Sequence, residues 1–167
     1  VWPIFEEAFH EYGLPQRVRS DNGPPFGCVG VGRLTRLSIN LIKAGVIPEW
    51  IRPGHPEENG RHERFHLTLK QETASPPKPT LVLQIKAMEN FSEEYNFERP
   101  HEALGMKTPG SCYTKSPRNW NGILKSPEYD TEMDVRKVCQ SGCIWLKQEE
   151  YYIGQSLQGE YIGLKHN

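Results

Sequence analysis

The sequence predicts a mixed α/β protein in which a layered region of helices and strands is followed by a small antiparallel β region. Three observations support this prediction. In the first hundred or so residues, apolar residues alternate between helical and strand spacing, in the order helix, strand, helix, strand, helix, helix. Residues 105–128 are then rich in Pro, Gly, Ser and Asn. The remaining residues form short alternating runs between turn signals.

Pro and Gly mark the first two elements. A helix is expected over residues 3–12, with Pro3 in its first turn and Gly13 as its stop. The stretch QRVRSDNG then reads as a short strand that ends in an Asp-Asn-Gly turn. This places Asp21 directly after a strand.

The next elements continue the alternation. Apolar residues at helical spacing indicate a helix that ends at Gly45, and its members are Leu34, Leu37, Leu41 and Ile42. VIPEWIR is the next predicted strand, and PGHPEENG is the loop that follows it. A helix is then expected over residues 58–72, before the stretch SPPKP. Another amphipathic helix is marked by Leu81, Val82, Ile85, Met88, Phe91 and Tyr95.

Four strand-like runs follow residue 129: MDVRKVCQ, CIWLKQ, EYYIG and GEYIGL. They predict a small antiparallel β-barrel-like domain over residues 129–167, with its own sheet. Cys139 and Cys143 flank a turn within it. They lack the second ligand pair of a structural zinc site, so two ordinary cysteines are the plainer interpretation, and a zinc site is the alternative.

Composition sets few limits on function. The chain has 167 residues, a net charge of −1 and a pI near 6.7, which gives no overall attraction to nucleic acid but leaves local basic patches open. No apolar run approaches the roughly 18 residues of a membrane span, so we expect no membrane partner. Four scattered cysteines are typical of a reduced, cytoplasmic compartment.

Residues 62–66 read His-Glu-Arg-Phe-His, a literal H-E-x-x-H that can bind zinc with the glutamate as general base. A catalytic zinc needs a third protein ligand. The extended form of the motif would have Gly at position 69 and His at position 72, where this chain has Leu69 and Glu72. A zinc hydrolase is therefore our third hypothesis.

A second interpretation keeps Glu63 and gives the two histidines no role as ligands. On an ideal helix, Glu63 and Lys70 lie within about 20° of each other, with Asn59 and His66 beside them. A carboxylate and a lysine on one exposed face suit a metal-bound phosphodiester. A solvated helix face with an incidental glutamate is the plain structural alternative.

Three stretches, VRSDNGPPF, PGHPEENGRHERFHLTLKQE and YNFERPHEALGMKTPGSCY, resemble the integrase catalytic core of bacterial insertion-sequence transposases near the IS481 group. These enzymes use a D-D-E set of carboxylates and are similar to retroviral integrases. The resemblance covers about residues 1–120. It implies a partial RNase H-like core over residues 1–104, a linker or wrapping segment over 105–128 and the β-barrel-like domain over 129–167.

The resemblance assigns roles to individual residues. It makes Asp21 and Glu63 the second and third acidic residues of the D-D-E set, and so both catalytic residues and metal ligands. It also implies a DNA contact by Lys70. The residues near the proposed site are further expected DNA contacts, to phosphates, with a solvated surface position as the plain alternative for each: Asn59, Arg61, His55 and Arg52. In NFERPHEAL, it leaves Arg99 and His101 open between closing the core and contacting DNA.

The chain departs from the family pattern in two ways. Residues 22–62 separate the two acids, a longer interval than is usual in the family, and the Gly-rich stretch GCVGVG is expected to absorb the surplus. The first aspartate is absent, because no Asp precedes Asp21. We expect it on a strand upstream of Val1, where the chain reads like a helix already under way. The fragment alone should therefore be inactive.

Carboxylates are hard oxygen ligands that suit Mg²⁺ or Mn²⁺, and two such ions can hold the attacking and leaving oxygens of an in-line displacement. The expected function is thus DNA transposition and integration: cleavage at the element end with water, then joining by the freed 3′-hydroxyl. The expected partners are the transposon ends and target DNA, with a homo-oligomer formed on DNA in the bacterial cytoplasm. The alternative is a non-catalytic transposase remnant that binds DNA or protein.

Overall fold

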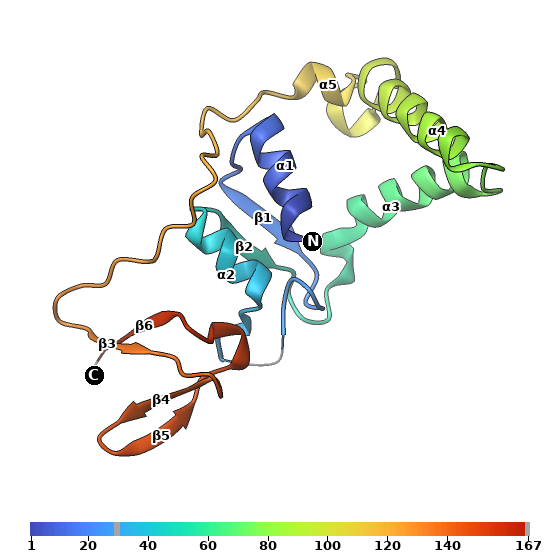
Figure 1. Cartoon of the computed structure of the whole chain (residues 1–167). Helices are drawn as coiled ribbons and strands as arrows, with labels where there is room; N and C mark the ends of the chain where they lie inside the picture. Colours follow the sequence, from blue (N-terminus) through green and yellow to red (C-terminus); the bar gives the residue numbers. More distant parts are fainter. Residues whose placement is uncertain (29–30, 166–167) are drawn as a thin grey trace. The chain divides into compact units, whose positions relative to one another are not determined.

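The computed structural model describes residues 1–28 and 31–165 (Figure 1). The chain divides into two compact units. The first unit comprises Val1–Gly54 and Ser116–Asn167, and the second comprises His55–Lys115. None of the described helices is both long enough and apolar enough to cross a bilayer.

A parallel strand pair organises the first unit (Figure 1). Strand β1 (Arg17–Ser20) pairs with β2 (Ile47–Trp50), and the register runs from Arg17 opposite Ile47 to Ser20 opposite Trp50. Helix α1 (Trp2–Tyr12) precedes this pair, and helix α2 (Arg36–Lys43) lies in the connection between the strands. Parallel strands need such a crossover. The predicted helix–strand–helix–strand order is therefore confirmed, and Asp21 directly follows β1.

The core of the first unit forms around α1 and α2. Its buried members are Phe9, Leu14, Leu37, Leu41, Ala44, Val46 and Trp120. The rings of Phe9 and Trp120 meet edge to face, with their centroids 6.1 Å apart. Trp120 comes from the Pro-rich stretch, which thus contributes a large side chain to the core.

The residues around Trp120 are tied to the first half of the unit by hydrogen bonds. The Ser116 hydroxyl donates to the Leu14 carbonyl at 2.7 Å, and the Arg118 guanidinium donates to the Pro15 carbonyl at 2.9 Å. A side chain at Gly13 would meet the Ser116 carbonyl at 2.7 Å, and Gly13 also has a φ of +78°. Both facts require glycine at this crossing.

The four strands predicted in the C-terminal region are present. Strand β3 (Asp134–Lys137) pairs with β6 (Tyr161–Leu164), and β4 (Cys143–Leu146) pairs with β5 (Glu149–Tyr152), all antiparallel. Within residues 1–28 and 31–165 they form two separate two-stranded ladders that do not close a barrel. A barrel-like arrangement therefore stays a prediction.

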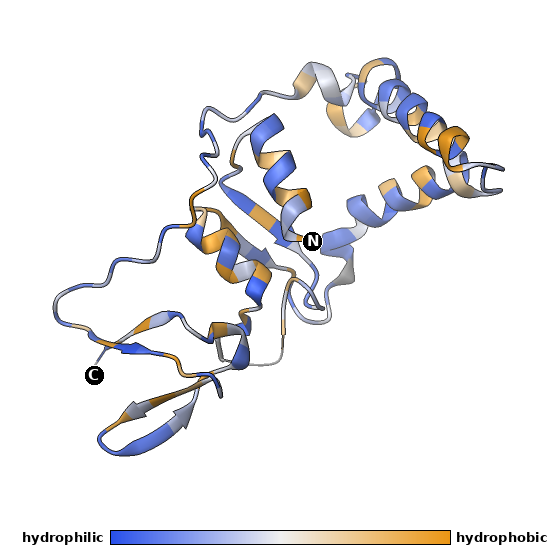
Figure 2. Ribbon diagram, viewed as in Figure 1, coloured by the Kyte–Doolittle hydropathy of each residue, from blue (hydrophilic) through white to orange (hydrophobic). Residues whose placement is uncertain are grey.

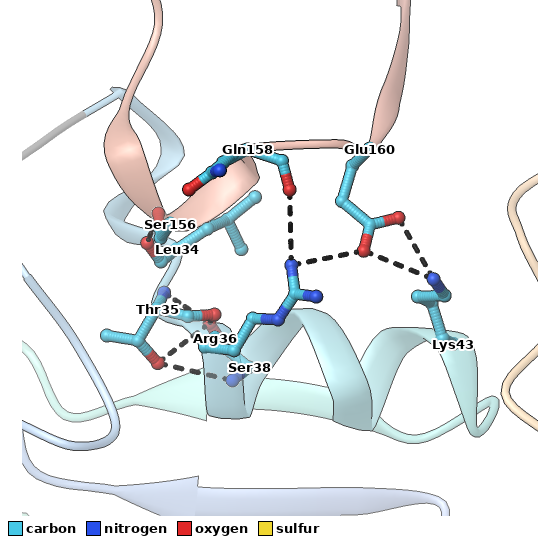
Figure 3. Close-up of polar contacts among 8 residues, drawn as sticks. All are labelled: Leu34, Thr35, Arg36, Ser38, Lys43, Ser156, Gln158 and Glu160. Carbon is cyan, nitrogen blue, oxygen red and sulfur yellow. Dashed lines mark hydrogen bonds and ion pairs between the residues drawn. The ribbon is translucent and has the colours of Figure 1, made fainter. Parts of the chain in front are cut away.

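The C-terminal ladders pack on α2. Val138, Ile144 and Leu157 form a buried cluster with Ile39 of that helix. Beside the cluster, the Glu160 carboxylate accepts hydrogen bonds from Lys43 at 2.9 Å and from Arg36 at 3.3 Å (Figure 3). Apolar packing and charge pairing thus hold this region to the parallel strand pair through α2.

The second unit is built from helices. It begins with the 3₁₀ turn Pro56–Asn59 and helix α3 (Gly60–Leu69), which continues into the π-helical turn Lys70–Ala74. The helix predicted over 58–72 is therefore α-helical only in its middle part. Within the π-helical turn, the Thr73 hydroxyl donates to the Leu69 carbonyl one turn back, at 2.7 Å.

The rest of the second unit follows Pro76 and Pro77. Helix α4 (Leu81–Glu93) continues into the π-helical turn Glu94–Glu98, and the 3₁₀ turn Glu102–Leu104 and the short helix α5 (Pro109–Cys112) complete the unit. The amphipathic helix predicted from Leu81 onward is confirmed.

Aromatic rings and one arginine join α3 to α4. The Phe65 ring lies 6.1 Å from that of Phe91 and 5.2 Å from that of Tyr95. Arg99 donates to both carboxylate oxygens of Glu72, at 2.9 and 2.8 Å, and to Glu94 at 2.7 Å. These contacts favour the structural role for Arg99 that the sequence left open.

Much of the apolar face of α4 is exposed. Phe91 is buried, whereas the side chains of Leu81 and Val82 at the start of the helix are 74% and 75% exposed. Figure 2 shows hydrophobic residues along this helix. The periodicity identified the helix correctly, but within the described part of the chain only its later turns are packed.

Candidate functional site

Asp21 lies where β1 ends, at the carboxyl end of the parallel strand pair. Its side chain is exposed, and its Oδ1 accepts a hydrogen bond from the Gly23 backbone N–H at 3.2 Å. This is an Asx turn, in which the side chain of an Asp fixes its own loop. The carboxylate is thus held at the strand end and still faces solvent.

The turn is also attached to the end of β2. The Asn22 Nδ2 donates to the Ile51 carbonyl at 3.0 Å, and the Ile51 N–H donates to the Ser20 carbonyl at 3.1 Å. Asn22 Oδ1 is buried, and among the described residues it has no hydrogen-bond partner. A buried acceptor without a donor is costly, so this oxygen suits a ligand that brings a proton or a positive charge. Its only signal in the sequence is the place of Asn22 in a turn.

Glu63 lies in the first turn of α3, where the helix dipole favours a carboxylate. The side chain is exposed, and within the described residues it forms no ion pair. Glu72, in contrast, accepts hydrogen bonds from Arg99, which lower the pKa of its carboxyl and hold it in an ion pair between helical segments. Glu63 is therefore an available carboxylate, and Glu72 is a structural one.

Lys70 has helical backbone geometry, which is required if Glu63 and Lys70 are to share one face of the helix. Its backbone has φ −63° and ψ −44°, and its N–H donates to the carbonyl of His66, although the π-helical turn begins at this residue. The seven-residue offset from Glu63 is thus helical throughout, and both side chains are exposed. Asn59, the N-cap residue of α3, forms no side-chain capping bond.

The two histidines of H-E-x-x-H bond to each other. The His62 and His66 Nε2 atoms lie 2.8 Å apart. Two imidazoles on one zinc, with Zn–N near 2.0–2.1 Å, hold their nitrogens about 3.3 Å apart. Over residues 1–28 and 31–165, no third His, Cys, Asp or Glu ligand joins this pair. The geometry gives no support to a zinc hydrolase.

The remaining predicted DNA contacts are distributed over both units. Arg52 is exposed in the first unit, and Arg61 is exposed on α3 in the second. His55 begins the second unit, and its Nδ1 lies 2.7 Å from Glu57 Oε1. The first unit thus carries Asp21 and Arg52, and the second carries all the other predicted site residues. The Gly-rich stretch predicted to absorb the long spacing includes residues 29 and 30, which lie outside the described residues.

Part of the chain that includes Glu63 and Lys70 is similar to known proteins. Residues 44–109 match the family described as Integrase core domain. The chain is 30% identical over 110 residues to an uncharacterized protein of insertion element IS136 from Agrobacterium fabrum (strain C58). The aligned region covers 62% of this chain and 52% of that protein. An uncharacterized IS136 protein from Agrobacterium tumefaciens (strain T37) matches to the same extent. The chain therefore spans about half the length of the curated relatives it matches.

Residues 44–109 are therefore similar to an integrase core domain, and the chain is distantly similar to bacterial insertion-element proteins. The matched segment includes Glu63 and Lys70 and begins after Asp21.

Proposed function

We propose that the chain is part of the RNase H-like catalytic core of a DNA transposase, in which Asp21 and Glu63 act as the second and third carboxylates of a D-D-E set. One observation carries the proposal. An exposed Asp at the carboxyl end of a parallel strand pair is combined, in one chain, with an exposed Glu that forms no ion pair among the described residues and lies inside the segment that matches an integrase core. In α/β proteins, ligands bind beyond the carboxyl ends of the parallel strands.

The chemistry of the donors fits a hard divalent cation. Asp21, Glu63 and the unpartnered Oδ1 of Asn22 all offer oxygen, the ligand atom that Mg²⁺ and Mn²⁺ prefer. When bound, such ions stabilise the charge that develops on the phosphoryl group during in-line displacement. The chain itself contributes the fixed position of Asp21, set by Gly23 and Ile51, and a carboxylate on a helix.

DNA is the proposed substrate, with this chain acting as one copy of a homo-oligomer on the element ends. Lys70 and Arg61 on and beside α3, with Asn59 at its start and His55 before it, would contact phosphates near Glu63. Arg52 would do the same from the first unit. Such contacts position the DNA without reading its sequence.

A binding experiment on the chain tests whether the two carboxylates share a metal. Mn²⁺ added to ¹⁵N-labelled protein should broaden the amide signals around Asp21 and Glu63 together, because both lie near one paramagnetic ion. Asp21→Asn should remove the broadening at both positions. Glu7→Gln, at an exposed position on α1, is the matched control and should leave it unchanged. Broadening at Glu63 that persists in Asp21→Asn would show separate sites and refute the assignment.

Activity is tested with the protein expressed from its complete reading frame. Mg²⁺-dependent cleavage and joining of element ends, lost in Glu63→Gln, would support a transposase core. DNA binding without either reaction would instead favour the non-catalytic remnant.

A further inference from the structure

Three metal-ligating side chains converge in the C-terminal part of the first unit, on residues that the proposed transposase site does not use. The sulfur atoms of Cys139 and Cys143 and a carboxylate oxygen of Glu150 all lie within 4.8 Å of one another. Cys143 is buried, Cys139 is half-buried and Glu150 is exposed. In the described part of the chain this is the one cluster of three such ligands.

A tight turn brings the two cysteines together. The Gly142 N–H donates to the Cys139 carbonyl at 3.0 Å, and the Cys139 N–H donates to the Cys143 carbonyl at 2.8 Å. Gly142 has a φ of +80°, and a side chain there would meet the Gly154 backbone at 2.8 Å. The turn therefore requires glycine at position 142. Its backbone hydrogen bonds hold the Cys139 and Cys143 side chains close to each other.

Strand register supplies the third ligand. In the β4–β5 ladder, Cys143 is opposite Tyr152 and Trp145 is opposite Glu150. Because side chains alternate along a strand, Cys143 and Glu150 lie on the same face as diagonal neighbours. A change of register by one residue would move Glu150 away from the face that carries Cys143 and bring Glu149 to that face instead. The pairing thus selects one of two adjacent glutamates.

We propose that Cys139, Cys143 and Glu150 bind a thiophilic divalent cation of the Zn²⁺ class. Two thiols release their protons to solvent and bind as thiolates, and the carboxylate completes a three-ligand set with a fourth position left for water or another ligand. Tetrahedral ligands on zinc, with Zn–S near 2.3 Å, lie about 3.8 Å apart, which is compatible with the present spacing. This site is independent of the proposed carboxylate site, which prefers hard cations.

The pKa values of the two thiols are shifted in opposite directions. A hydrogen bond to Ser141, whose Oγ lies 2.9 Å from the Cys139 sulfur, lowers the pKa of Cys139. At Cys143 the contact with Ser141 also lowers the pKa, but burial and the neighbouring Glu150 carboxylate outweigh it and raise the net value. A bound cation offsets both the burial of the thiolate and its repulsion by Glu150.

Titration of the reduced full chain with Co²⁺ tests the site. We expect one Co²⁺ per chain, with the thiolate charge-transfer band and the visible bands of tetrahedral cobalt, displaced by one equivalent of Zn²⁺. Cys139→Ser should abolish the charge-transfer band or reduce it to that of one thiolate. Glu150→Gln should weaken binding by roughly tenfold or more, since it removes a direct ligand. Glu150 is exposed, so this variant should keep the fold.

Three controls separate this site from the other candidates. Glu149→Gln alters the adjacent residue on the opposite face, Cys112→Ser removes an exposed thiol of the second unit, and His62→Ala breaks the histidine pair on α3. All three should bind Co²⁺ like the unaltered chain. The proposal is wrong if Co²⁺ binding is absent in the reduced chain, if Glu150→Gln binds as tightly as Glu149→Gln, or if His62→Ala removes the bound metal. A Cys139–Cys143 disulfide that survives mild reductant in the purified protein would also overturn it.

Discussion

Lys43 and Glu160 lie 117 residues apart in the sequence and form a mostly buried ion pair, with Lys43 Nζ 2.9 Å from Glu160 Oε2. Only 17% and 13% of their side chains are exposed. Arg36 reaches the same carboxylate at 3.3 Å and also donates to the Gln158 carbonyl (Figure 3). One carboxylate from the C-terminal region thus pairs with two cations of α2.

We expect Glu160→Gln to reduce the free energy of unfolding by about 1–3 kcal/mol, because it leaves Lys43 poorly solvated and without an opposite charge. Glu128→Gln, at an exposed position in the same region, should change it by less than about 0.5 kcal/mol. Urea unfolding followed by circular dichroism measures both. Equal effects would mean that the ion pair does not hold the C-terminal ladders to α2.

Trp120 provides a test of the Pro-rich stretch. It is buried among Phe9, Leu37 and Leu41, so Trp120→Ala should cost about 3–5 kcal/mol. Trp145 is the matched control, because its ring is mainly exposed on β4 and its removal should cost less than about 1 kcal/mol. Chemical denaturation of the two variants gives the comparison. A small loss for Trp120→Ala would indicate that residues 116–128 are a linker and not part of the core.

Arg99 should make the stability of the second unit depend on acid pH. Hydrogen bonds and charge from Arg99 lower the pKa of Glu72 below its ordinary value of 4.5. The folded chain therefore binds this proton less readily than the unfolded chain, and the stabilisation is present above pH 4.5 and is lost as the pH falls through the lowered pKa. Arg99→Gln should cost about 1 kcal/mol at neutral pH, and the difference should shrink below pH 4.5. Unfolding midpoints across pH 2–7 measure it, and a difference that stays constant would contradict the pairing.

In the protein expressed from its complete reading frame, Glu63→Gln should abolish end cleavage and strand joining and leave DNA binding largely intact. The amide keeps the size of the side chain but removes the charge that binds the cation. Cleavage and joining assays in Mg²⁺, with a parallel DNA-binding titration, separate the two effects. Robust joining by this variant would mean that another glutamate is the catalytic one, with Glu57 and Glu58 the nearest candidates.

Lys70→Ala should affect affinity and not chemistry. Removing about one phosphate contact should weaken DNA binding and reduce the slope of log affinity against log salt by about one unit. Lys86→Ala, at an exposed position on α4, is the control and should leave that slope unchanged. Unaltered salt dependence in Lys70→Ala would exclude a direct phosphate contact.

Local signals in the sequence were sufficient for the order of the first two helices and the first two strands, since Gly13, the Asp-Asn-Gly turn and Gly45 mark where elements end. They were not sufficient for features that arise from tertiary packing. Trp120 lies in a segment without periodicity, so nothing local indicated its burial. Glu150 becomes a ligand candidate only through the β4–β5 register, and the unpartnered Asn22 Oδ1 is visible only once the turn is packed against Ile51.

The first unit is discontinuous in the sequence: residues 55–115 are inserted between its two halves. During synthesis, Phe9, Leu37 and Leu41 leave the ribosome well before Trp120, which completes their core. At translation rates of about 5–20 residues per second, that apolar surface stays exposed for several seconds before Trp120 is synthesised. The parallel strand pair that holds Asp21 therefore depends on a segment made late, and a ribosome that stalls between residues 55 and 115 would expose a surface for chaperones to bind.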